Sequence, residues 1–243
     1  FLCCIIIQNL LKRNLVKYRA VIFDLDGTII NSTGAWNNAI ISFIKLNGID
    51  LNEHSLQKLK KQLCGLGQPE CVDIFKKKFG LKESVDQIEQ LFEQELVRLV
   101  VNAMENNVHF IEGFVDFHRQ AITSGLKTGI ATNSNDTCLE LVTKKFNLNQ
   151  FFGEHIYNLT DVGNVGKPRP DLYLHVAKQL GVSPEECVVI EDSSCGIKAA
   201  VDAGMFCFGI NTAGQEDLLQ QADVIIDKYH EIDLFRLLKK HSH

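Results

Sequence analysis

Apolar and polar positions follow three different patterns along the chain. The first is the short apolar run Arg19–Phe23, which stops at Asp24 and predicts a parallel strand covered on both faces. From residue 35 to about 107, apolar residues recur every three to four positions and predict four helices, at 35–46, 55–63, 69–79 and 85–101. No strand is expected there, so we interpret this stretch as a small helical bundle inserted after the first strand.

After residue 113, strands and helices are predicted to alternate. The expected strands are 127–131, 155–158, 187–190, 206–210 and 223–226. The expected helices are 114–124, 136–146, 170–180, 196–203, 216–221 and 232–240. Such alternation favours an α/β fold with a doubly wound, Rossmann-like parallel sheet. We therefore expect a core formed by residues 19–33 and 113–243, with residues 34–112 forming a small all-helical cap domain.

Composition argues against two classes of partner. The formal net charge is −5 and the pI is near 5.9, which is unlike the basic footprint of a nucleic-acid-binding protein. Residues 1–18 form an N-terminal extension whose apolar run is too short to cross a bilayer, and no membrane partner is expected. The eight cysteines contain no C-x-x-C pair, a pattern typical of buried, reduced thiols in a cytoplasmic protein.

Polar and charged side chains stand at the ends of predicted core strands or just before a core helix. In chain order they are Asp24, Asp26, Thr132, Asn133, Lys167, Glu191 and Asp192. Ligands of doubly wound sheets bind outside the carboxyl ends of the strands. These side chains, although far apart in the sequence, are therefore expected to meet at one rim of the sheet.

These residues, in this order and at this spacing, resemble the four motifs of the haloacid-dehalogenase (HAD) superfamily of phosphatases and phosphomutases. The resemblance covers the chain from Arg19 onward, and the helical insertion resembles the cap of the branch that includes sugar-phosphate phosphatases and β-phosphoglucomutase. It implies a magnesium-dependent phosphatase that hydrolyses a small phosphorylated metabolite, such as a sugar phosphate. The partner would be a small phosphate ester, and we expect a monomer or a weak homodimer.

The two first-motif aspartates have complementary expected roles. Asp24 would attack phosphorus and form an aspartyl-phosphate, which is a known use of carboxylate nucleophiles. Asp26 would protonate the leaving oxygen and then take a proton from the attacking water. Gly27 permits the turn that brings both side chains to one cleft. Asp-x-Asp-Gly is also a common turn sequence, so a purely structural interpretation stays open at this point.

The remaining motif residues supply positive charge and hydrogen bonds. Asp24, Asp192 and the main-chain carbonyl of Asp26 are expected to hold Mg²⁺, which prefers oxygen ligands. Several carboxylates and a phosphate cannot share a low-dielectric cleft without cations, and Mg²⁺ and Lys167 are the available ones. Glu191 is expected to orient Lys167 or to bind the metal through water. An acidic helix cap at Glu191 is the alternative.

Phosphate and substrate contacts are expected from both domains. Thr132, Asn133 and Lys167 would bind the phosphoryl oxygens, although a simple turn at Thr132 and a surface loop lysine are the alternatives. In the resembled mutases a histidine and a cap arginine stand where this chain has Trp36 and Gln68. The phosphatase is therefore favoured over a β-phosphoglucomutase-like enzyme. Trp36 and Gln68 could instead contact a sugar-like leaving group, with packing in the cap core as the alternative for Trp36. A catalytically degenerate, ligand-binding domain is the third alternative.

Overall fold

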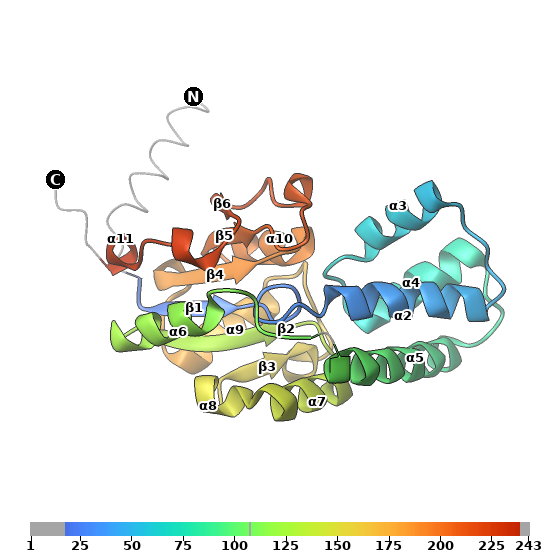
Figure 1. The fold of residues 1–243 in the computed structure, drawn as a ribbon, viewed down its shortest axis with the longest axis horizontal. Helices are drawn as coiled ribbons and strands as arrows, with labels where there is room; N and C mark the ends of the chain where they lie inside the picture. The colour runs from blue at the N-terminus through green and yellow to red at the C-terminus, as the bar shows by residue number, and fades with distance from the viewer. Residues whose placement is uncertain (1–17, 107, 239–243) are drawn as a thin grey trace.

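The computed structural model describes residues 18–106 and 108–238. Within them, six parallel strands form one sheet in the order β3-β2-β1-β4-β5-β6 (Figure 1). The strands are β1 (Ala20–Phe23), β2 (Lys127–Thr132), β3 (Ile156–Asn158), β4 (Cys187–Glu191), β5 (Phe206–Ile210) and β6 (Val224–Ile226). The first strand lies inside the sheet, between β2 and β4. The α/β class and all the predicted strands are confirmed, with ends that differ by one residue at most.

Helices cover both faces of this sheet. One face packs on α6 (Phe114–Thr123), α7 (Asp136–Phe146) and α8 (Leu148–Phe152), and the other on α9 (Asp171–Leu180) and α10 (Ser194–Asp202). The short helix α11 (Leu234–Leu238) lies near the end of the described chain. Successive residues of β1 belong to opposite apolar clusters, because side chains of a strand point alternately to its two faces. Both faces of β1 are therefore buried, which explains why its sequence is apolar at every position.

The structure differs from the predicted core elements in two places. Helix α8 was not predicted, because Asn147 adopts a left-handed conformation (φ 52°) that ends α7 and starts a separate short helix. The helix predicted at 216–221 is wrong: the chain forms only a 3₁₀ turn, Glu216–Leu218. Leu219 is the one fully buried apolar side chain of that segment, and a single contact gives little support to two helical turns. The end of the helix predicted at 232–240 lies outside the described residues.

Four helices form a lobe beside the carboxyl ends of the strands (Figure 1). They are α2 (Thr33–Leu46), α3 (Glu53–Leu63), α4 (Gln68–Phe79) and α5 (Val85–Asn106). Three buried phenylalanines form the centre of the lobe: Phe43 stacks on Phe75 at 4.8 Å between ring centroids, and Phe92 meets both rings edge-on. The expected all-helical insertion is present, while its exact limits at residues 34 and 112 stay a prediction.

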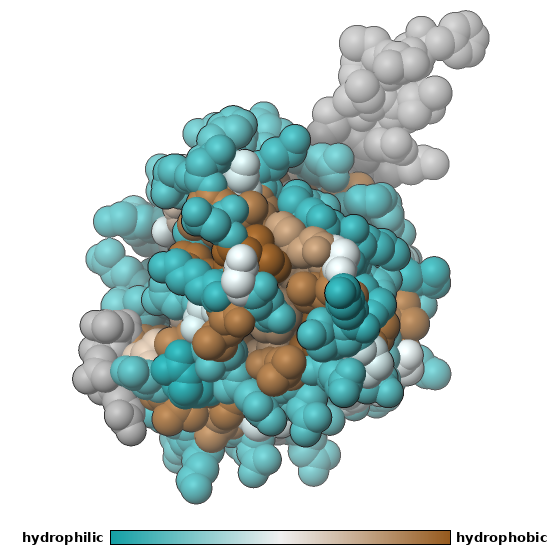
Figure 2. Space-filling model, turned by 90° about the vertical axis from the view of Figure 1, so that its right-hand side faces the viewer, coloured by the Kyte–Doolittle hydropathy of each residue, from teal (hydrophilic) through white to brown (hydrophobic). Residues whose placement is uncertain are grey.

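The outer surface of the lobe is mostly hydrophilic. Figure 2 looks at the lobe end of the molecule and shows apolar side chains emerging between polar ones. Among the large exposed apolar residues of the lobe are Leu46, Val85 and Leu91. No helix in the described part of the chain is long and apolar enough to cross a membrane. Disulfides are also absent among the described cysteines, whereas Cys3, Cys4 and the rest of residues 1–17 lie outside the described residues.

Candidate active site

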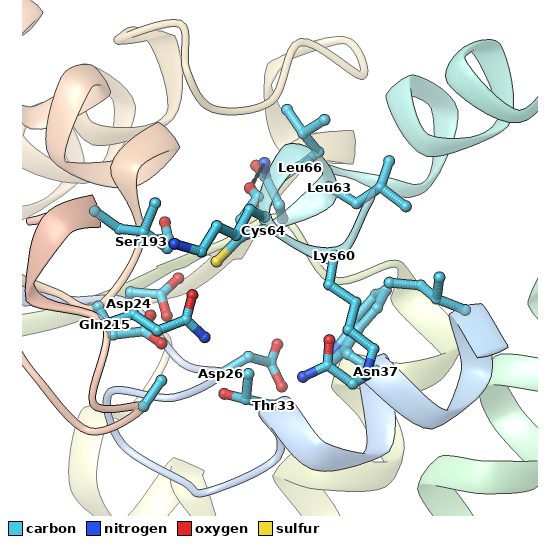
Figure 3. A pocket seen from close by; sticks show the side chains of 18 of the residues that line it. Asp24, Asp26, Thr33, Asn37, Lys60, Leu63, Cys64, Leu66, Ser193 and Gln215 are labelled. Atoms are coloured by element: carbon cyan, nitrogen blue, oxygen red, sulfur yellow. Dashed lines mark hydrogen bonds between the residues drawn. The ribbon is translucent and has the colours of Figure 1, made fainter. Parts of the chain in front are cut away.

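The predicted site residues meet where the lobe faces the sheet. Asp24 directly follows β1, Thr132 ends β2 and Glu191 ends β4, so three strand ends bring their side chains to one rim. A cavity of about 310 Å³ opens there between core and lobe. Its lining includes five of the predicted residues, namely Asp24, Asp26, Thr132, Asn133 and Asp192. Figure 3 shows Asp24 and Asp26 on the core side, with Lys60 reaching in from the lobe.

Lys167 is almost completely buried, at 1% exposure, and sits behind Asp24. Its Nζ donates to Asp24 Oδ1 at 2.6 Å and to Glu191 Oε1 at 2.7 Å. The ammonium also lies 4.8 Å from the ring centroid of Tyr173, a cation–π distance. Lys167 is therefore not a free surface lysine. Its charge is directed at Asp24 from inside the core.

Glu191 has no exposed surface, and both of its oxygens are occupied. Oε1 accepts from Lys167 and from the Tyr173 hydroxyl (3.1 Å), while Oε2 accepts from the N–H and hydroxyl of Ser193 (2.8 and 2.9 Å). Four donors saturate the carboxylate. A Cβ at Gly196 would lie 1.5 Å from Glu191 Oε1, so this packing requires glycine there. The contacts fit a residue that orients Lys167.

Asp26 is held by two serine hydroxyls. Ser134 donates to Oδ2 at 2.6 Å, and Ser32 donates to Oδ1. The intervening turn depends on Gly27, whose φ is +90° and whose Cβ would lie 1.9 Å from Asp192 Oδ2. Glycine at this position therefore lets Asp192 approach the first motif. Neither hydroxyl contact was predicted, because Ser32 and Ser134 lie six and 108 residues from Asp26, and neither spacing signals a contact.

The electrostatics of the cluster are dominated by burial. Burial raises the pKa of Asp24 to about 8, with Lys167 opposing the rise and Glu191 and Asp26 adding to it. Burial, followed by the nearby carboxylates of Asp24, Glu191 and Asp26, holds the pKa of Asp192 well above its usual range. The carboxylates Asp24 and Asp26 with Glu191 and Asp192 outnumber the one buried ammonium. Ionising Asp24 and Asp192 therefore requires more positive charge than the ammonium of Lys167 supplies.

A divalent cation would supply the missing positive charge. Asp24, Glu191 and Asp192 each offer an oxygen within 4.8 Å of the others. An all-oxygen set of this kind suits Mg²⁺, which also keeps several waters. Since Glu191 is saturated by four donors, Asp24 and Asp192 are the two members of this group of three whose oxygens are available at the cavity. Two of the predicted metal ligands, Asp24 and Asp192, thus belong to one buried acidic cluster, and their binding of Mg²⁺ stays a prediction.

Two predicted substrate residues have other contacts. Gln68 does not line the cavity: its Nε2 donates to the Glu89 carbonyl at 3.0 Å and its Oε1 accepts from Asn135 at 2.7 Å. The structure therefore does not bring Gln68 to the site. Asn133 lines the cavity, but its side chain bonds to the backbone of Lys167 and Gly65. Sequence reasoning saw neither contact, because each joins segments far apart in the chain.

The lobe contributes several lining residues that the sequence alone did not identify. They include Asn37 from α2 and Gln57, Lys60 and Lys61 from α3, while Trp36, weighed as a leaving-group contact, also lines the cavity. Lys61 is engaged with Asp217 of the core at 2.7 Å. No acidic partner of Lys60 occurs among the described residues. The lobe side of the cavity thus offers amides and one unengaged ammonium.

Comparisons with known proteins agree with this architecture. The model of the haloacid dehalogenase-like hydrolases matches residues 18–204. The chain is 27% identical to the 6-phosphogluconate phosphatase of Escherichia coli over 192 residues, 79% of this chain and 82% of that protein. It is also 27% identical to the phosphorylated carbohydrates phosphatase of Thermotoga maritima, over 76% of this chain and 82% of that one.

Solved structures show the same fold. A family IA HAD hydrolase from Entamoeba histolytica superposes with a TM-score of 0.78 at 25% identity, covering 90% of this chain and 97% of that one. The β-phosphoglucomutase of Clostridium difficile superposes with a TM-score of 0.76 at 24% identity, covering 92% and 96%. The chain therefore belongs to the haloacid dehalogenase-like hydrolases, and it is a phosphoric monoester hydrolase of that family.

Proposed function

We propose that the protein is a magnesium-dependent phosphatase that hydrolyses a small phosphorylated metabolite through an aspartyl-phosphate on Asp24. The observation that carries the proposal is the position of Asp24, which faces the cavity while Lys167 donates to its Oδ1 from behind at 2.6 Å. The ammonium fixes the carboxylate and offsets its charge. A carboxylate held in this way can approach a phosphorus atom from the core side.

The steps follow from the side chains around Asp24. The free oxygen of Asp24 attacks phosphorus, and the bond to the leaving oxygen breaks as Asp26 delivers a proton to it. Water then attacks the aspartyl-phosphate, gives its proton to Asp26 and releases inorganic phosphate. Ser32 and Ser134 hold the Asp26 carboxylate in one orientation for both transfers. The Thr132 hydroxyl accepts from the N–H of Ser134 at 3.1 Å, so its own proton is available to a phosphoryl oxygen.

Asp24, Asp192 and the main-chain carbonyl of Asp26 would hold Mg²⁺. The ion, when bound, supplies positive charge that offsets the carboxylates and the phosphate. Lys167 neutralises the cluster from the buried side, and Glu191 keeps Lys167 directed at Asp24 through a 2.7 Å contact. We assign Glu191 this orienting role because its oxygens are already saturated.

A sugar phosphate is the proposed substrate class. The lobe side of the cavity presents the amides of Asn37 and Gln57 and the ammonium of Lys60, groups that hydrogen-bond to hydroxyls. A volume of about 310 Å³ suits a small metabolite rather than a macromolecule. The names of the two relatives, a 6-phosphogluconate phosphatase and a phosphorylated carbohydrates phosphatase, support the same class.

The test is a panel of phosphate esters, assayed for free phosphate with and without Mg²⁺. We expect turnover only with Mg²⁺, and none with Asp24→Asn, because a carboxamide is not a nucleophile toward phosphorus. Asp202→Asn is the control, since this exposed carboxylate lies outside the cavity lining and pairs with Lys198 on the surface. Wild-type turnover in Asp24→Asn contradicts the mechanism. An isomerised sugar phosphate instead of free phosphate supports the phosphomutase alternative, and no turnover of any ester supports the degenerate one.

A further inference from the structure

The side chain of Asn133 joins three segments of the molecule. It is 7% exposed and follows β2 directly. Its Oδ1 accepts from the N–H of Lys167 at 2.9 Å, and its Nδ2 donates to the Lys167 carbonyl at 3.1 Å. The second Nδ2 hydrogen goes to the carbonyl of Gly65, at 2.9 Å, in the lobe loop between α3 and α4. Both donors of the amide are therefore used, one of them on the lobe.

Gly65 also touches the second support of Lys167. Its φ is +74°, and a Cβ there would lie 2.3 Å from Ser193 Oγ, so the loop backbone rests directly on Ser193. Ser193 donates to Glu191, and Glu191 accepts from Lys167. Gly65 of the lobe thus contacts both Asn133 and Ser193, and each of these residues supports Lys167. Asn133 bonds to the backbone of Lys167. Glu191, which accepts from Ser193, binds the ammonium of Lys167.

Movement of the lobe away from the core would break this arrangement. The Gly65 carbonyl would leave Asn133, and a buried N–H without an acceptor is unfavourable. Asn133 would lose one of its three hydrogen bonds, and the Lys167 backbone that it contacts would be held less firmly. Substrate lies between lobe and core, because residues of both line the same cavity. Closure of the lobe onto the core and the positioning of Lys167 are therefore coupled.

We propose that Asn133 is a positioning residue that places Lys167 correctly only while Gly65 is seated against the core. The lobe loop thereby acts as a closure sensor for the active site, and the lysine reaches its working position when the cavity is shut. This inference rests on the proposed function, in which Lys167 balances the charge of Asp24. It predicts that a substitution at Gly65, on the lobe side of the contact, lowers turnover as much as a substitution at Asn133, on the core side.

The experiment is a double-mutant cycle with Gly65→Ala and Asn133→Ala. Gly65→Ala acts from the lobe: its Cβ would meet Ser193 Oγ and displace the loop from the core, while no core residue is replaced. Its control is Gly48→Ala, another lobe glycine with positive φ (+67°), around which a Cβ meets nothing within 4 Å. The control introduces similar backbone strain without touching the core. Turnover of p-nitrophenyl phosphate, with kcat and KM measured separately, and the melting temperature are recorded for each variant.

We expect each single variant to lower kcat by at least about tenfold, because small displacements of a charged group in an active site have such effects. KM should change less, and Gly48→Ala should keep the wild-type kcat. The double variant should be no slower than the slower single variant, because each substitution removes the same Asn133–Gly65 hydrogen bond. Independent, multiplied effects on kcat, or a wild-type kcat in Gly65→Ala, would overturn the proposal.

A second readout separates this inference from the proposed function. Hydrogen exchange of the 64–67 loop is measured with and without inorganic phosphate and Mg²⁺. Phosphate should slow exchange of this loop in the wild-type protein and in Gly48→Ala, but not in Asn133→Ala. If the wild-type protein shows this protection and releases no phosphate from esters, the proposed function fails while the coupling stands. Equal protection in Asn133→Ala refutes the coupling.

Discussion

Replacing Asp192 with asparagine tests whether the acidic cluster binds a divalent cation, with no need for a substrate. The change keeps the shape of the side chain and removes one of the two carboxylates, Asp24 and Asp192, that are proposed to hold the ion. Wild-type protein should be stabilised by Mg²⁺, and Asp192→Asn should respond only at much higher Mg²⁺ concentrations. The readout is the melting temperature as Mg²⁺ is added.

The magnitude follows from the spacing of the cluster. Oxygens of Asp24, Glu191 and Asp192 lie within 4.8 Å of one another. At an effective dielectric constant of about 20, two like charges at that distance repel by roughly 3 kcal/mol, so a bound cation relieves a substantial strain. Mg²⁺ at about 100 times its Kd should stabilise the native state by about 2.7 kcal/mol. For a domain of this size that shift corresponds to roughly 5–10 °C.

The dependence of stability on pH provides a second test in the same experiment. Without a cation, the native-state pKa of Asp24 is raised from 3.8 to about 8, so the folded protein holds a proton that the unfolded chain has lost. Stability from this group is complete below pH 3.8 and is lost as the pH rises toward 8. Stabilisation by Mg²⁺ should therefore grow across this range. Asp202→Asn is the matched control. The reasoning is refuted if Asp192→Asn shows the wild-type response to Mg²⁺.

Three further predictions concern Asp26, the lobe and a buried histidine. Asp26→Asn should lower kcat strongly while substrate still binds, as measured by single-turnover kinetics and calorimetry; loss of folding would instead show a structural residue. Lys60→Gln should raise KM for the preferred sugar phosphate by about tenfold, roughly one charged hydrogen bond, with Lys58→Gln, outside the cavity lining, as control; an unchanged KM contradicts the substrate contact. Burial lowers the pKa of His118 from 6.5 to about 4, so His118 stabilises the fold above pH 6.5 and that stability is lost as the pH falls toward 4. Chemical denaturation at saturating Mg²⁺ should show the difference between wild type and His118→Gln changing by about 3 kcal/mol over this range, and a constant difference contradicts the linkage.

The convergence of the site could be predicted from the sequence because topology determines it. Parallel strands all end at one edge, so polar residues after each strand meet there, whatever their separation along the chain. Asp24, Thr132 and Asp192 required only correct strand ends. Lys167 required the resemblance as well, since it stands before a helix in a loop. The catalytic roles of these residues stay predictions.

The contacts of individual side chains could not be predicted. Gln68 was expected at the substrate because it stands where the resembled mutases have a cap arginine, but its amide is bonded to Asn135 and Glu89. Tyr173, which donates to Glu191, is one of several apolar residues on the buried face of α9 and has no distinguishing pattern. Periodicity assigns a residue to a face of an element. The partner across the interface depends on packing that one sequence does not encode visibly.

The interior position of β1 also determines the order in which the fold can assemble. This strand, Ala20–Phe23, comes early in the described chain, yet its two neighbours begin at Lys127 and Cys187. The centre of the sheet therefore cannot close until the chain through β4 has been synthesised, and such non-local pairing is slow. The lobe helices, in contrast, are consecutive in sequence and can pack on one another earlier. We expect pulse-labelling hydrogen exchange during refolding to protect the lobe before β1.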